Sequence, residues 1–578
     1  MTRLFNDPAA FVDEATEGFV AAHPGRVRQV PGGVIRSTKS EPDTVAVVIG
    51  GGSGHYPAFA GLVGQGLAHG AAMGNLFASP SAQQIYSVAK AANNGAGVLL
   101  SYGNYAGDVL HFGQARDRLV SEGIPCEMVK VIDDVSSASL EEIRKRRGIA
   151  GDLTVFKIAS AAAEAGYSLE EVVRVAEAAN LRTRSFGVAF DGCTLPGADD
   201  ALFHVPEGKM AVGLGIHGEP GISEQEVPSA DELAELLVAR LLEELPEGVS
   251  QANGARASVL LNGLGTIKYE ELFVVYRRVN RLLEEAGVVI VEPEVGELVT
   301  SLDMAGASLT LFWLDEELER FWQAPADAPA YRKGSVAEVE QIDAAELDIP
   351  DPDAIPPASE ESRQSARCIM EALEATRKII GENAEELGRI DAVAGDGDHG
   401  IGMERGSRAA EETARDALER GAGAGTLLRM AGDAWADRAG GTSGAIWGAA
   451  LNALAATIGD EKAPDAETIA NGVEKARDNI MHFGKAQVGD KTLIDVLVPF
   501  SDALTEQVNR QASLSDAWGT AAERAEEAAQ ATADLTPKIG RARPLAEKSV
   551  GTPDAGAISL AMIVQAVHAV ISNNANGG

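Results

Sequence analysis

The chain has 578 residues, which is too long for a single hydrophobic core, and this length predicts about three to four folding units. Its formal net charge of −37 makes nucleic acid and anionic membrane surfaces poor partners. The three cysteines, Cys126, Cys193 and Cys368, are far apart and show no metal-ligand spacing. A disulfide framework is therefore not expected, which fits a cytoplasmic protein.

Membrane insertion is not expected from the sequence. The N-terminal residues lack the apolar segment of a signal peptide. The most apolar stretch, Ala557 to Ile571, contains Gln565 and His568 and falls short of a spanning length. We interpret it as a buried terminal helix.

Strand and helix signals alternate in the first half of the chain. Residues 44–49 form a short β-branched run that ends in glycines, and residues 97–100 and 288–291 look alike. Alanine-rich helical stretches lie between such runs. This alternation predicts an α/β module with largely parallel sheets and helices on their faces. A helical stretch at 159–179 gives way to a strand-like stretch, which predicts an internal boundary near 180–190.

Four prolines among acidic and small residues mark a linker at about 345–360, since such a segment suits neither a helix nor a central strand. The linker separates a first module, residues 1–344, from a second module, residues 361–578. The second module carries helical periodicity and almost no strand signal, so we expect an all-α domain. The helices are expected at 362–386, 403–420, 424–437, 445–457, 513–534 and 556–572.

A glycine-spaced acidic run lies between the first two expected helices of the second module. Asp391, Asp396 and Asp398 precede His399 within nine positions, and this spacing suits a loop rather than one face of a helix. Oxygen ligands converging on one point suit Mg²⁺, with phosphate oxygens completing the shell. The alternative is a solvated acidic turn, in which the three carboxylates would repel one another. The run favours a phosphoryl-transfer enzyme.

Small residues precede several helices of the second module. Gly441, Thr442 and Ser443 lie directly before a helical stretch, where free backbone N–H groups bind anions. An ordinary Ser/Thr helix cap is the alternative. Loops around Gly484 and Asp554 are expected to contact a nucleotide, and either could equally be a polar turn.

Glycine-rich loops also follow the strands of the first module. Gly52, Ser53 and His55 come directly after the first strand, and Asp108 follows the next one. The carboxyl edge of a parallel sheet is where small ligands bind, and glycines allow close approach of the backbone. His217 lies between glycines on a later loop, which is unusual for a packed core histidine. The remaining histidines that we interpret as structural are His23, His69, His111, His204, His482 and His568.

Seven motifs stand in order along the chain: GGGSGH (50–55), NYAGD (104–108), RRGIAGD (146–152), GLGIHGEPG (213–221), DAVAGDGDHG (391–400), GGTSG (440–444) and KAQVGDKTLID (485–495). Through these motifs the chain resembles the dihydroxyacetone kinase family over nearly its whole length. The resemblance implies a ketose-binding module of two α/β subdomains and a nucleotide-binding module that is an α-helical barrel. Fusion of the two in one chain implies ATP as the phosphoryl donor, and family members are often homodimers.

The resemblance also implies residue roles. His217 would bind the carbonyl of a short ketose or aldose covalently as a hemiaminal, and His55 would hydrogen-bond that substrate. Asp108 would accept the proton of the attacking hydroxyl. Gly52 and Ser53 would line the substrate site. In the second module Asp391, Asp396 and Asp398 would hold two Mg²⁺ ions, and the nucleotide would contact His399, Gly441, Thr442, Ser443, Gly484 and Asp554.

The chain departs from the family pattern at the substrate pocket. Gly103 stands where a lysine is usual, and Tyr56 stands where a glutamate is common. Arg543 and Pro544 replace a Ser-Tyr pair near the C-terminus. Loss of a long cationic side chain at 103 leaves space and removes a hydrogen-bond donor. This predicts a preference for a larger ketose, such as erythrulose, over dihydroxyacetone.

Two other functions remain as alternatives. Some family members form cyclic FMN from FAD with the same nucleotide domain, so FAD-AMP lyase activity is one. A ketose-sensing regulator without catalysis is the other, and it should have lost the aspartate run or the covalent histidine. Since both are present, we favour the kinase.

Overall fold

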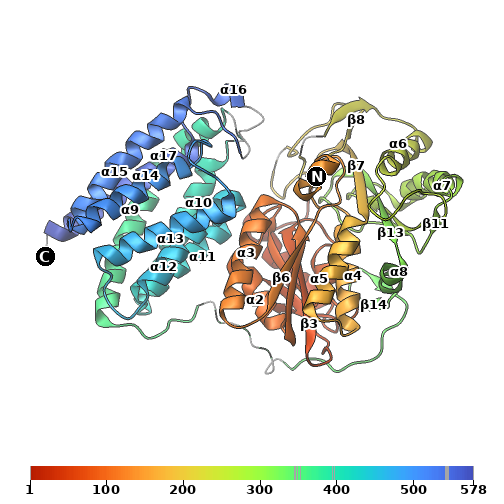
Figure 1. Ribbon diagram of the computed structural model, residues 1–578, viewed down its shortest axis with the longest axis horizontal. Coiled ribbons are helices and arrows are strands. Elements are labelled where there is room, and N and C mark those ends of the chain that lie inside the picture. The colour runs from red at the N-terminus through yellow and green to blue at the C-terminus, as the bar shows by residue number, and fades with distance from the viewer. Residues whose placement is uncertain are drawn as a thin grey trace. The chain divides into compact units, whose positions relative to one another are not determined.

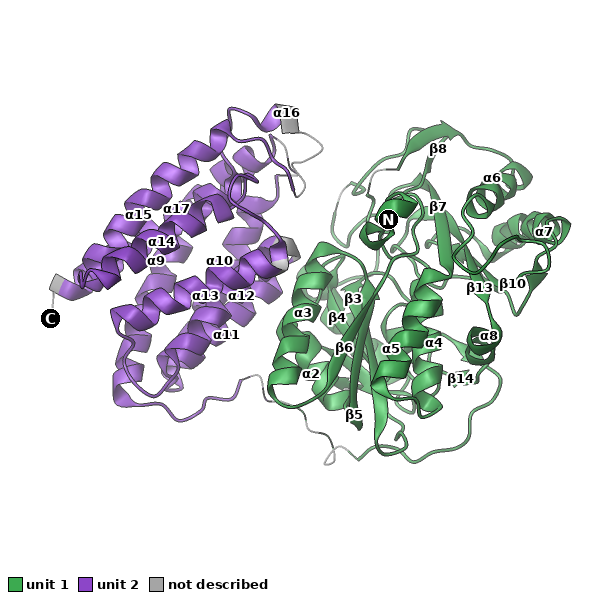
Figure 2. Cartoon of the chain, viewed as in Figure 1, with its two compact units in different colours: residues 1–350 green, residues 351–578 purple. Residues whose placement is uncertain are grey.

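The computed structural model contains two compact units, residues 1–350 and 351–578 (Figures 1 and 2). The division falls within the predicted linker, and the first helix of the second unit begins at Glu360, capped by Ser359. The described residues are all but 1, 199, 220, 344–346, 348, 350, 352, 394, 396, 540–545 and 577–578, and the side chains of 441, 442, 483, 546, 547 and 576 are also outside the description.

The first unit contains a six-stranded sheet in the order β1-β2-β4-β3-β5-β6. Strands β3, β4, β5 and β6 pair in parallel. Strand β2 pairs antiparallel with both of its neighbours, β4 and β1. Because parallel strands end at one edge, the loops after β3, β5 and β6 meet there. The strands are β1 (Val27–Val30), β2 (Gly33–Arg36), β3 (Thr44–Ser53), β4 (Gly70–Leu76), β5 (Gly95–Gly103) and β6 (Cys126–Val131).

Helices cover both faces of this sheet (Figure 1). Helices α2 (Ala82–Ala92) and α3 (Ala106–Ser121) pack on one face, and α4 (Asp152–Glu164) and α5 (Leu169–Leu181) pack on the other. Helix α4 is buried at every position up to Ala163, since it is enclosed by the sheet, α5 and α8. The N-terminal segment adds η1 (Pro8–Ala10) and α1 (Phe11–Ala22), and the loops contain η2 (Ala60–Leu62) and η3 (Leu140–Lys145).

The second sheet begins with β7 (Thr183–Asp191), near the internal boundary expected from the sequence. Its order is β11-β10-β13-β7-β8-β9, with β12 also paired to β10. The prediction of largely parallel sheets is wrong here, because β13 lies between β10 and β7 and runs antiparallel to both. Strand–helix alternation identifies strands and leaves their direction open. The elements are β8 (Lys209–Val212), β9 (Ser223–Glu226), α6 (Ala230–Leu242), β10 (Arg256–Gly263), α7 (Tyr269–Glu285), β11 (Val289–Ile290), β12 (Glu294–Gly296), β13 (Ala305–Leu314), α8 (Glu316–Trp322), β14 (Ala326–Asp327) and β15 (Arg332–Lys333).

The second unit is helical throughout its described residues, which confirms the predicted fold class. Helix α13 was not predicted, and α14 was predicted only as a helix that follows the loop around Gly484. Pro499 inside α14 and Gly472 inside α13 weaken the helical signal of these segments. The helices are α9 (Glu360–Asp391), α10 (His399–Glu419), α11 (Ala424–Ala439), α12 (Gly441–Ile458), α13 (Ala466–Gly484), α14 (Ile494–Asn509), α15 (Leu514–Ala531), η5 (Thr532–Asp534), α16 (Ala546–Ser549) and α17 (Ala555–Asn576).

The apolar helix α17 packs against α9 and α15 within this unit. Its residues Ala557, Leu560 and Ala561 are buried, and the Trp518 indole of α15 donates to the Val564 carbonyl at 2.9 Å. By length and composition, Ala555–Ala575 is the one described helix that could cross a membrane, a test that packed core helices also pass.

Candidate active site

The loop after β3 is built by close backbone contacts. A Cβ on Gly52 would lie within 3 Å of the Phe77 and Ala78 backbone, so a side chain does not fit there. The Ser53 hydroxyl donates to the Gly74 carbonyl at 2.7 Å. Gly52 and Ser53 therefore shape the loop, and the Ser53 hydroxyl is already bonded within it.

Two predicted residues, His55 and His217, come together from opposite sheets of the first unit. Their Nε2 atoms lie 3.0 Å apart. The His55 Nδ1–H donates to the Thr300 carbonyl at 2.7 Å, and the Thr300 N–H donates back to the His55 carbonyl. Burial, and then the charge of His217, lower the pKa of His55 to about 3. His55 is thus held as a neutral imidazole whose Nε2 accepts a hydrogen bond.

Glu219 fixes the other nitrogen of His217. One carboxylate oxygen accepts from the His217 backbone N–H at 3.0 Å, and the other lies 3.1 Å from Nδ1. Burial alone would raise the pKa of Glu219, but the hydrogen bonds and charge of His217, with Arg147 at 3.8 Å, lower it to about 2. Because Nδ1–H points to this carboxylate, Nε2 is the atom that faces the pocket. The two Nε2 atoms lie at hydrogen-bond distance, so a proton can pass between them.

Aromatic rings surround His217. The centroid of Tyr105 lies 4.5 Å from the His217 ring and that of Phe77 lies 5.6 Å away, both nearly perpendicular to it. Phe77 has a φ of +51°, an unfavourable conformation for a bulky residue that is held by packing over Gly52 and Gly54. Backbone strain of this kind is concentrated at functional sites.

Asp108 lies in the first turn of α3, at the same sheet edge. Its side chain is buried, and the Ser79 hydroxyl donates to it at 2.8 Å. Burial raises the pKa of Asp108 to about 6, opposed by Ser79 and by the charge of His217. A carboxylate with that pKa is a suitable base near neutral pH.

The RRGIAGD motif supports this edge. Asp133 accepts from the backbone N–H groups of Ile149 and Gly151 at 2.8 and 2.7 Å. Arg146 forms a two-pronged ion pair with Glu244 at 2.7 Å. Arg147 pairs with Asp134 and reaches towards Glu219. The motif therefore holds the backbone of this edge in place through ion pairs and hydrogen bonds, and we assign no reacting group to it.

In the second unit, a glycine turn folds back on Asp391, the last residue of α9. The carboxylate of Asp391 accepts from the Gly397 N–H at 2.8 Å, and its carbonyl accepts from Gly395 at 2.6 Å. Burial and the Asp391 charge raise the pKa of Asp398, which precedes α10. Asp396 lies outside the described residues. A carboxylate whose ionisation is disfavoured by burial and by a neighbouring carboxylate, as at Asp398, fits a cation with hard oxygen ligands.

Within the described ranges, no group of three or more His, Cys, Asp or Glu is arranged to hold a metal ion. The described part of the predicted magnesium site therefore consists of Asp391 and Asp398. Asp554 lies in the same electrostatic environment: burial, with smaller contributions from the charges of Asp495 and Asp391, raises its pKa to about 6. Its carboxylate also caps α17 by accepting from Ala557 at 2.8 Å.

The other predicted nucleotide contacts differ in their setting. His399 is the first residue of α10, and its Nε2 lies 3.0 Å from the Ser559 hydroxyl of α17. Gly441, Thr442 and Ser443 are the first residues of α12, and the helix is capped by Gly440 with no side-chain cap, so the ordinary Ser/Thr cap is not formed. The side chain of Thr442 lies outside the description.

Gly484 ends α13, and the loop that follows it leads into α14, as the sequence predicts. A Cβ on Gly484 would meet no other atom within 4 Å, so close backbone approach does not explain this glycine. The loop that follows instead wraps around Asp495, which accepts from the N–H groups of Gly489 and Thr492 at 2.5 and 2.8 Å. The buried ammonium of Lys491 donates to the carbonyls of Leu535 and Ser549.

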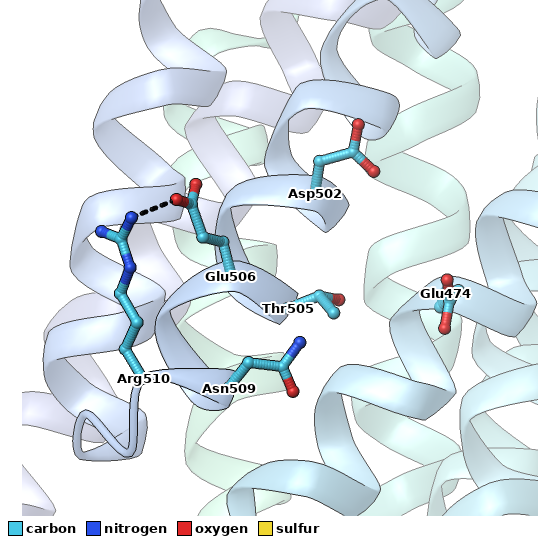
Figure 3. Close-up of a pocket in the computed structure, with 6 residues that line it drawn as sticks. All are labelled: Glu474, Asp502, Thr505, Glu506, Asn509 and Arg510. Carbon is cyan, nitrogen blue, oxygen red and sulfur yellow. Dashed lines mark hydrogen bonds and ion pairs between the residues drawn. The ribbon is translucent and has the colours of Figure 1, made fainter.

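A separate hollow of about 420 Å³ lies on α13 and α14 (Figure 3). Glu506 pairs there with Arg510, and no residue of the predicted nucleotide site lines the hollow. Its lining residues are Glu474, Asp502, Thr505, Glu506, Asn509 and Arg510.

Sequence reasoning gave no role to Glu219 or Tyr105, although both stand in the quoted motifs. Glu219 lies in the same glycine-rich motif as His217, and a carboxylate two residues from a candidate nucleophile was a usable signal. Thr300, Ser79 and Phe77 were missed, because they contact the histidines and Asp108 across long sequence separations, which no local pattern reveals.

Comparison with known proteins agrees with this two-unit arrangement. Residues 17–330 match the Dak1 domain and residues 393–569 match the DAK2 domain. The chain therefore belongs to the dihydroxyacetone kinase family, as its motifs predicted.

Relatives align over almost the whole chain. An L-erythrulose kinase of Pectobacterium atrosepticum is 67% identical, over 99% of this chain and 97% of its own. A D-erythrulose kinase of Mycolicibacterium smegmatis is 56% identical over 100% of both. The human triokinase/FMN cyclase is 30% identical over 99% of both. The dihydroxyacetone kinase of C. freundii in complex with AMP-PNP and Mg²⁺ superposes with a TM-score of 0.52 at 29% identity, covering 98% of this chain and 99% of that one.

Proposed function

We propose that the chain phosphorylates a terminal hydroxyl of the four-carbon ketose erythrulose. The chain is an ATP-dependent ketose kinase, as its family and its full-length relatives establish. The observation that carries the finer proposal is the high identity to two erythrulose kinases together with the paired histidines of the first unit. Since those relatives act on opposite enantiomers, the proposal covers both hands of the sugar.

We assign substrate capture to the first module predicted from the sequence, residues 1–344, which lies within the first unit. The lone pair of His217 Nε2 adds to the carbonyl carbon, and the carbon–oxygen double bond becomes a single bond. The proton between the two Nε2 atoms moves to His55 as His217 attacks, and His55 then delivers it to the new oxygen, giving the hydroxyl of the hemiaminal. The charge of the site is unchanged, because the substituted imidazolium stays paired with Glu219.

Asp108 is the proposed base for phosphoryl transfer. It accepts the proton of the terminal hydroxyl as that oxygen bonds to the γ-phosphorus of ATP and ADP leaves. The raised pKa of Asp108 supports this role, because its carboxylate is basic enough to take a proton near neutral pH. Ser79 holds one oxygen of the carboxylate in place.

Nucleotide binding is assigned to the second module predicted from the sequence, residues 361–578, which lies within the second unit. Asp391, Asp396 and Asp398 would hold two Mg²⁺ ions, and Gly441, Thr442, Ser443, His399 and Asp554 would contact the nucleotide. Bound Mg²⁺ supplies positive charge that neutralises the phosphate oxygens. Calorimetric titration of Mg²⁺ with a non-hydrolysable ATP analogue counts the ions.

The decisive experiment measures ATP-dependent phosphorylation of both erythruloses, dihydroxyacetone, D-glyceraldehyde and glycerol, with His217→Ala alongside. We expect turnover of the carbonyl sugars, fastest with an erythrulose, none with glycerol, and a loss of at least 100-fold in the variant. Equal rates in wild type and variant would refute covalent capture, and a preference for dihydroxyacetone would refute the four-carbon substrate.

The lyase alternative has support in the similarity to the human triokinase/FMN cyclase. Incubation with FAD and Mn²⁺ tests it, and cyclic FMN would be its product. We further propose, from the family alone, that the chain is a cytoplasmic homodimer, which light scattering and cell fractionation test.

A further inference from the structure

Lys491 has an unusual backbone and an unusual side-chain position in the second unit. Its φ is +62°, which residues other than glycine rarely adopt, and the residue is only 5% exposed. Asp495 fixes the loop on both sides of it by accepting from the N–H groups of Gly489 and Thr492. A backbone conformation of this kind persists only where its surroundings hold it, and it is concentrated at functional sites.

The Lys491 ammonium ties together the ends of two short helices. It donates to the carbonyl of Leu535, directly after η5, at 3.1 Å, and to the carbonyl of Ser549, the last residue of α16, at 2.6 Å. Carbonyls at a helix end lack a donor within the helix, and a lysine ammonium is a suitable partner for them. A neutral side chain at 491 would leave both carbonyls without this donor.

The segment that follows α16 leads to Asp554 and lies along η5. The Gly551 N–H donates to the Ala533 carbonyl at 2.9 Å. The Asp554 N–H donates to the hydroxyl of Thr532, the first residue of η5, also at 2.9 Å. Because Lys491 joins the end of η5 to the end of α16, it helps to fix the backbone that carries Asp554.

Asp554 lies at the end of this unit to which the nucleotide is assigned. It caps the start of α17, and the charge of Asp391 contributes to its raised pKa, so the two carboxylates are near each other. Further along α17, the Ser559 hydroxyl lies 3.0 Å from Nε2 of His399, the first residue of α10. The start of α17 is therefore close to both predicted partners of the nucleotide and its metal.

We propose that Lys491 is a positioning residue for nucleotide binding, because its ammonium holds Asp554 and the start of α17 beside Asp391. This inference rests on the proposed function. Lys491 acts through the backbone at 535 and 549 and requires no contact of its own with ATP. Loss of its ammonium should weaken the binding of Mg²⁺-nucleotide and leave capture of the ketose by the first unit intact.

The test compares the wild type with Lys491→Met and Lys491→Arg. Calorimetry measures the Kd of a non-hydrolysable ATP analogue with Mg²⁺, and steady-state kinetics measures the KM of ATP. In Lys491→Met we expect both constants to rise by about 10-fold or more, as for residues that orient the ligands of a metal site. Lys491→Arg retains the charge and the N–H donors and should recover most of the affinity.

Two further readouts separate positioning from a merely structural role. The carbon-13 signal of the hemiaminal should be the same in all three proteins, because the ketose binds in the first unit. A residue that only stabilised the fold would reduce the amount of active protein, and hence the apparent kcat, without changing the KM of ATP.

The matched control is Lys548→Met, which removes the same charge from an exposed position next to Ser549. It should leave the Kd of the analogue unchanged. Thr532→Val provides a second variant, because it removes the acceptor of the Asp554 N–H without touching Lys491. It should raise the Kd in the same direction, and it decides if Lys491→Met does not fold.

The outcomes distinguish the two levels of the proposal. A wild-type protein that phosphorylates no ketose overturns the proposed function and this inference with it. An active wild type, together with a Lys491→Met variant whose analogue Kd and KM of ATP are unchanged, overturns this inference alone. Loss of affinity that is equally large in Lys548→Met also overturns it, since a general charge effect would then suffice.

Discussion

His55 and His217 are separated by 162 positions in the chain, yet their Nε2 atoms lie 3.0 Å apart. Both Nδ1 atoms are committed elsewhere, one to the Thr300 carbonyl and the other to the Glu219 carboxylate. The pair therefore has one reactive nitrogen, on His217, and one nitrogen that can take up and return its proton.

Glu219→Gln should weaken substrate capture. The amide retains the shape of the carboxylate but lacks the charge that balances the substituted imidazolium, so we expect kcat/KM to fall by about 10- to 100-fold, as for partners that orient a reacting histidine. Steady-state kinetics and the carbon-13 signal of the hemiaminal measure the effect. Glu224→Gln, on the exposed strand β9, is a suitable control. A variant with normal adduct and normal turnover would refute the role of Glu219.

Asp108→Asn should separate capture from transfer. We expect the hemiaminal to form normally while kcat falls by at least 100-fold, since an amide does not accept the proton of the hydroxyl. In the wild type, kcat should fall as the pH drops through about 6, where Asp108 becomes protonated. Loss of the adduct together with turnover would instead indicate a binding role.

The same substitution should change stability in the opposite direction. The pKa of Asp108 is raised in the folded state, so ionising it opposes folding, and that penalty grows as the pH rises from the unfolded pKa of about 4 towards about 6. Asp108→Asn removes the penalty. Its melting temperature should therefore exceed that of the wild type at pH 8, with the gain shrinking at pH 4. A gain that is equal at both pH values would contradict this linkage.

Asp391→Asn and Asp398→Asn should impair only the nucleotide reaction. We expect each to raise the Mg²⁺ concentration needed for half-maximal activity by at least 10-fold, because each removes a charged oxygen ligand. The hemiaminal of the first unit should remain. Glu386→Gln, an exposed position on α9, controls for loss of negative charge nearby. Unchanged Mg²⁺ dependence in both variants would place the cation elsewhere.

Parts of this molecule were predictable from sequence because their signals are local. The glycine-spaced aspartates and His217 stand out within single motifs, and the helical character of the second unit follows from its periodicity. The direction of β13 was not predictable, because it depends on which strands it pairs with. Likewise Phe77 and Tyr105 look like ordinary core aromatics, and only the fold brings their rings against His217.

Gly103 illustrates the same limit. The sequence indicated space at this position, whereas the ring of Tyr105 lies directly beside it. A Cβ at position 103 would lie 3.1 Å from the Cε2 atom of this ring, so the space beside Gly103 is already partly filled. A glycine in the sequence does not tell whether the space beside it is empty or is filled by another side chain.

The split origin of the histidine pair also has a consequence for the maturation of the chain. His217 and Glu219 lie between β8 and β9 of the second sheet, while His55 follows β3 of the first. The contact between the two Nε2 atoms, and the bond from His55 to Thr300, therefore form only when both sheets are assembled. A nascent or partly unfolded chain therefore exposes an ordinary histidine without its proton partner. Binding of the ketose at His217 therefore requires completed folding, and the amount of labelled ketose bound would measure the fraction of correctly assembled molecules in a preparation.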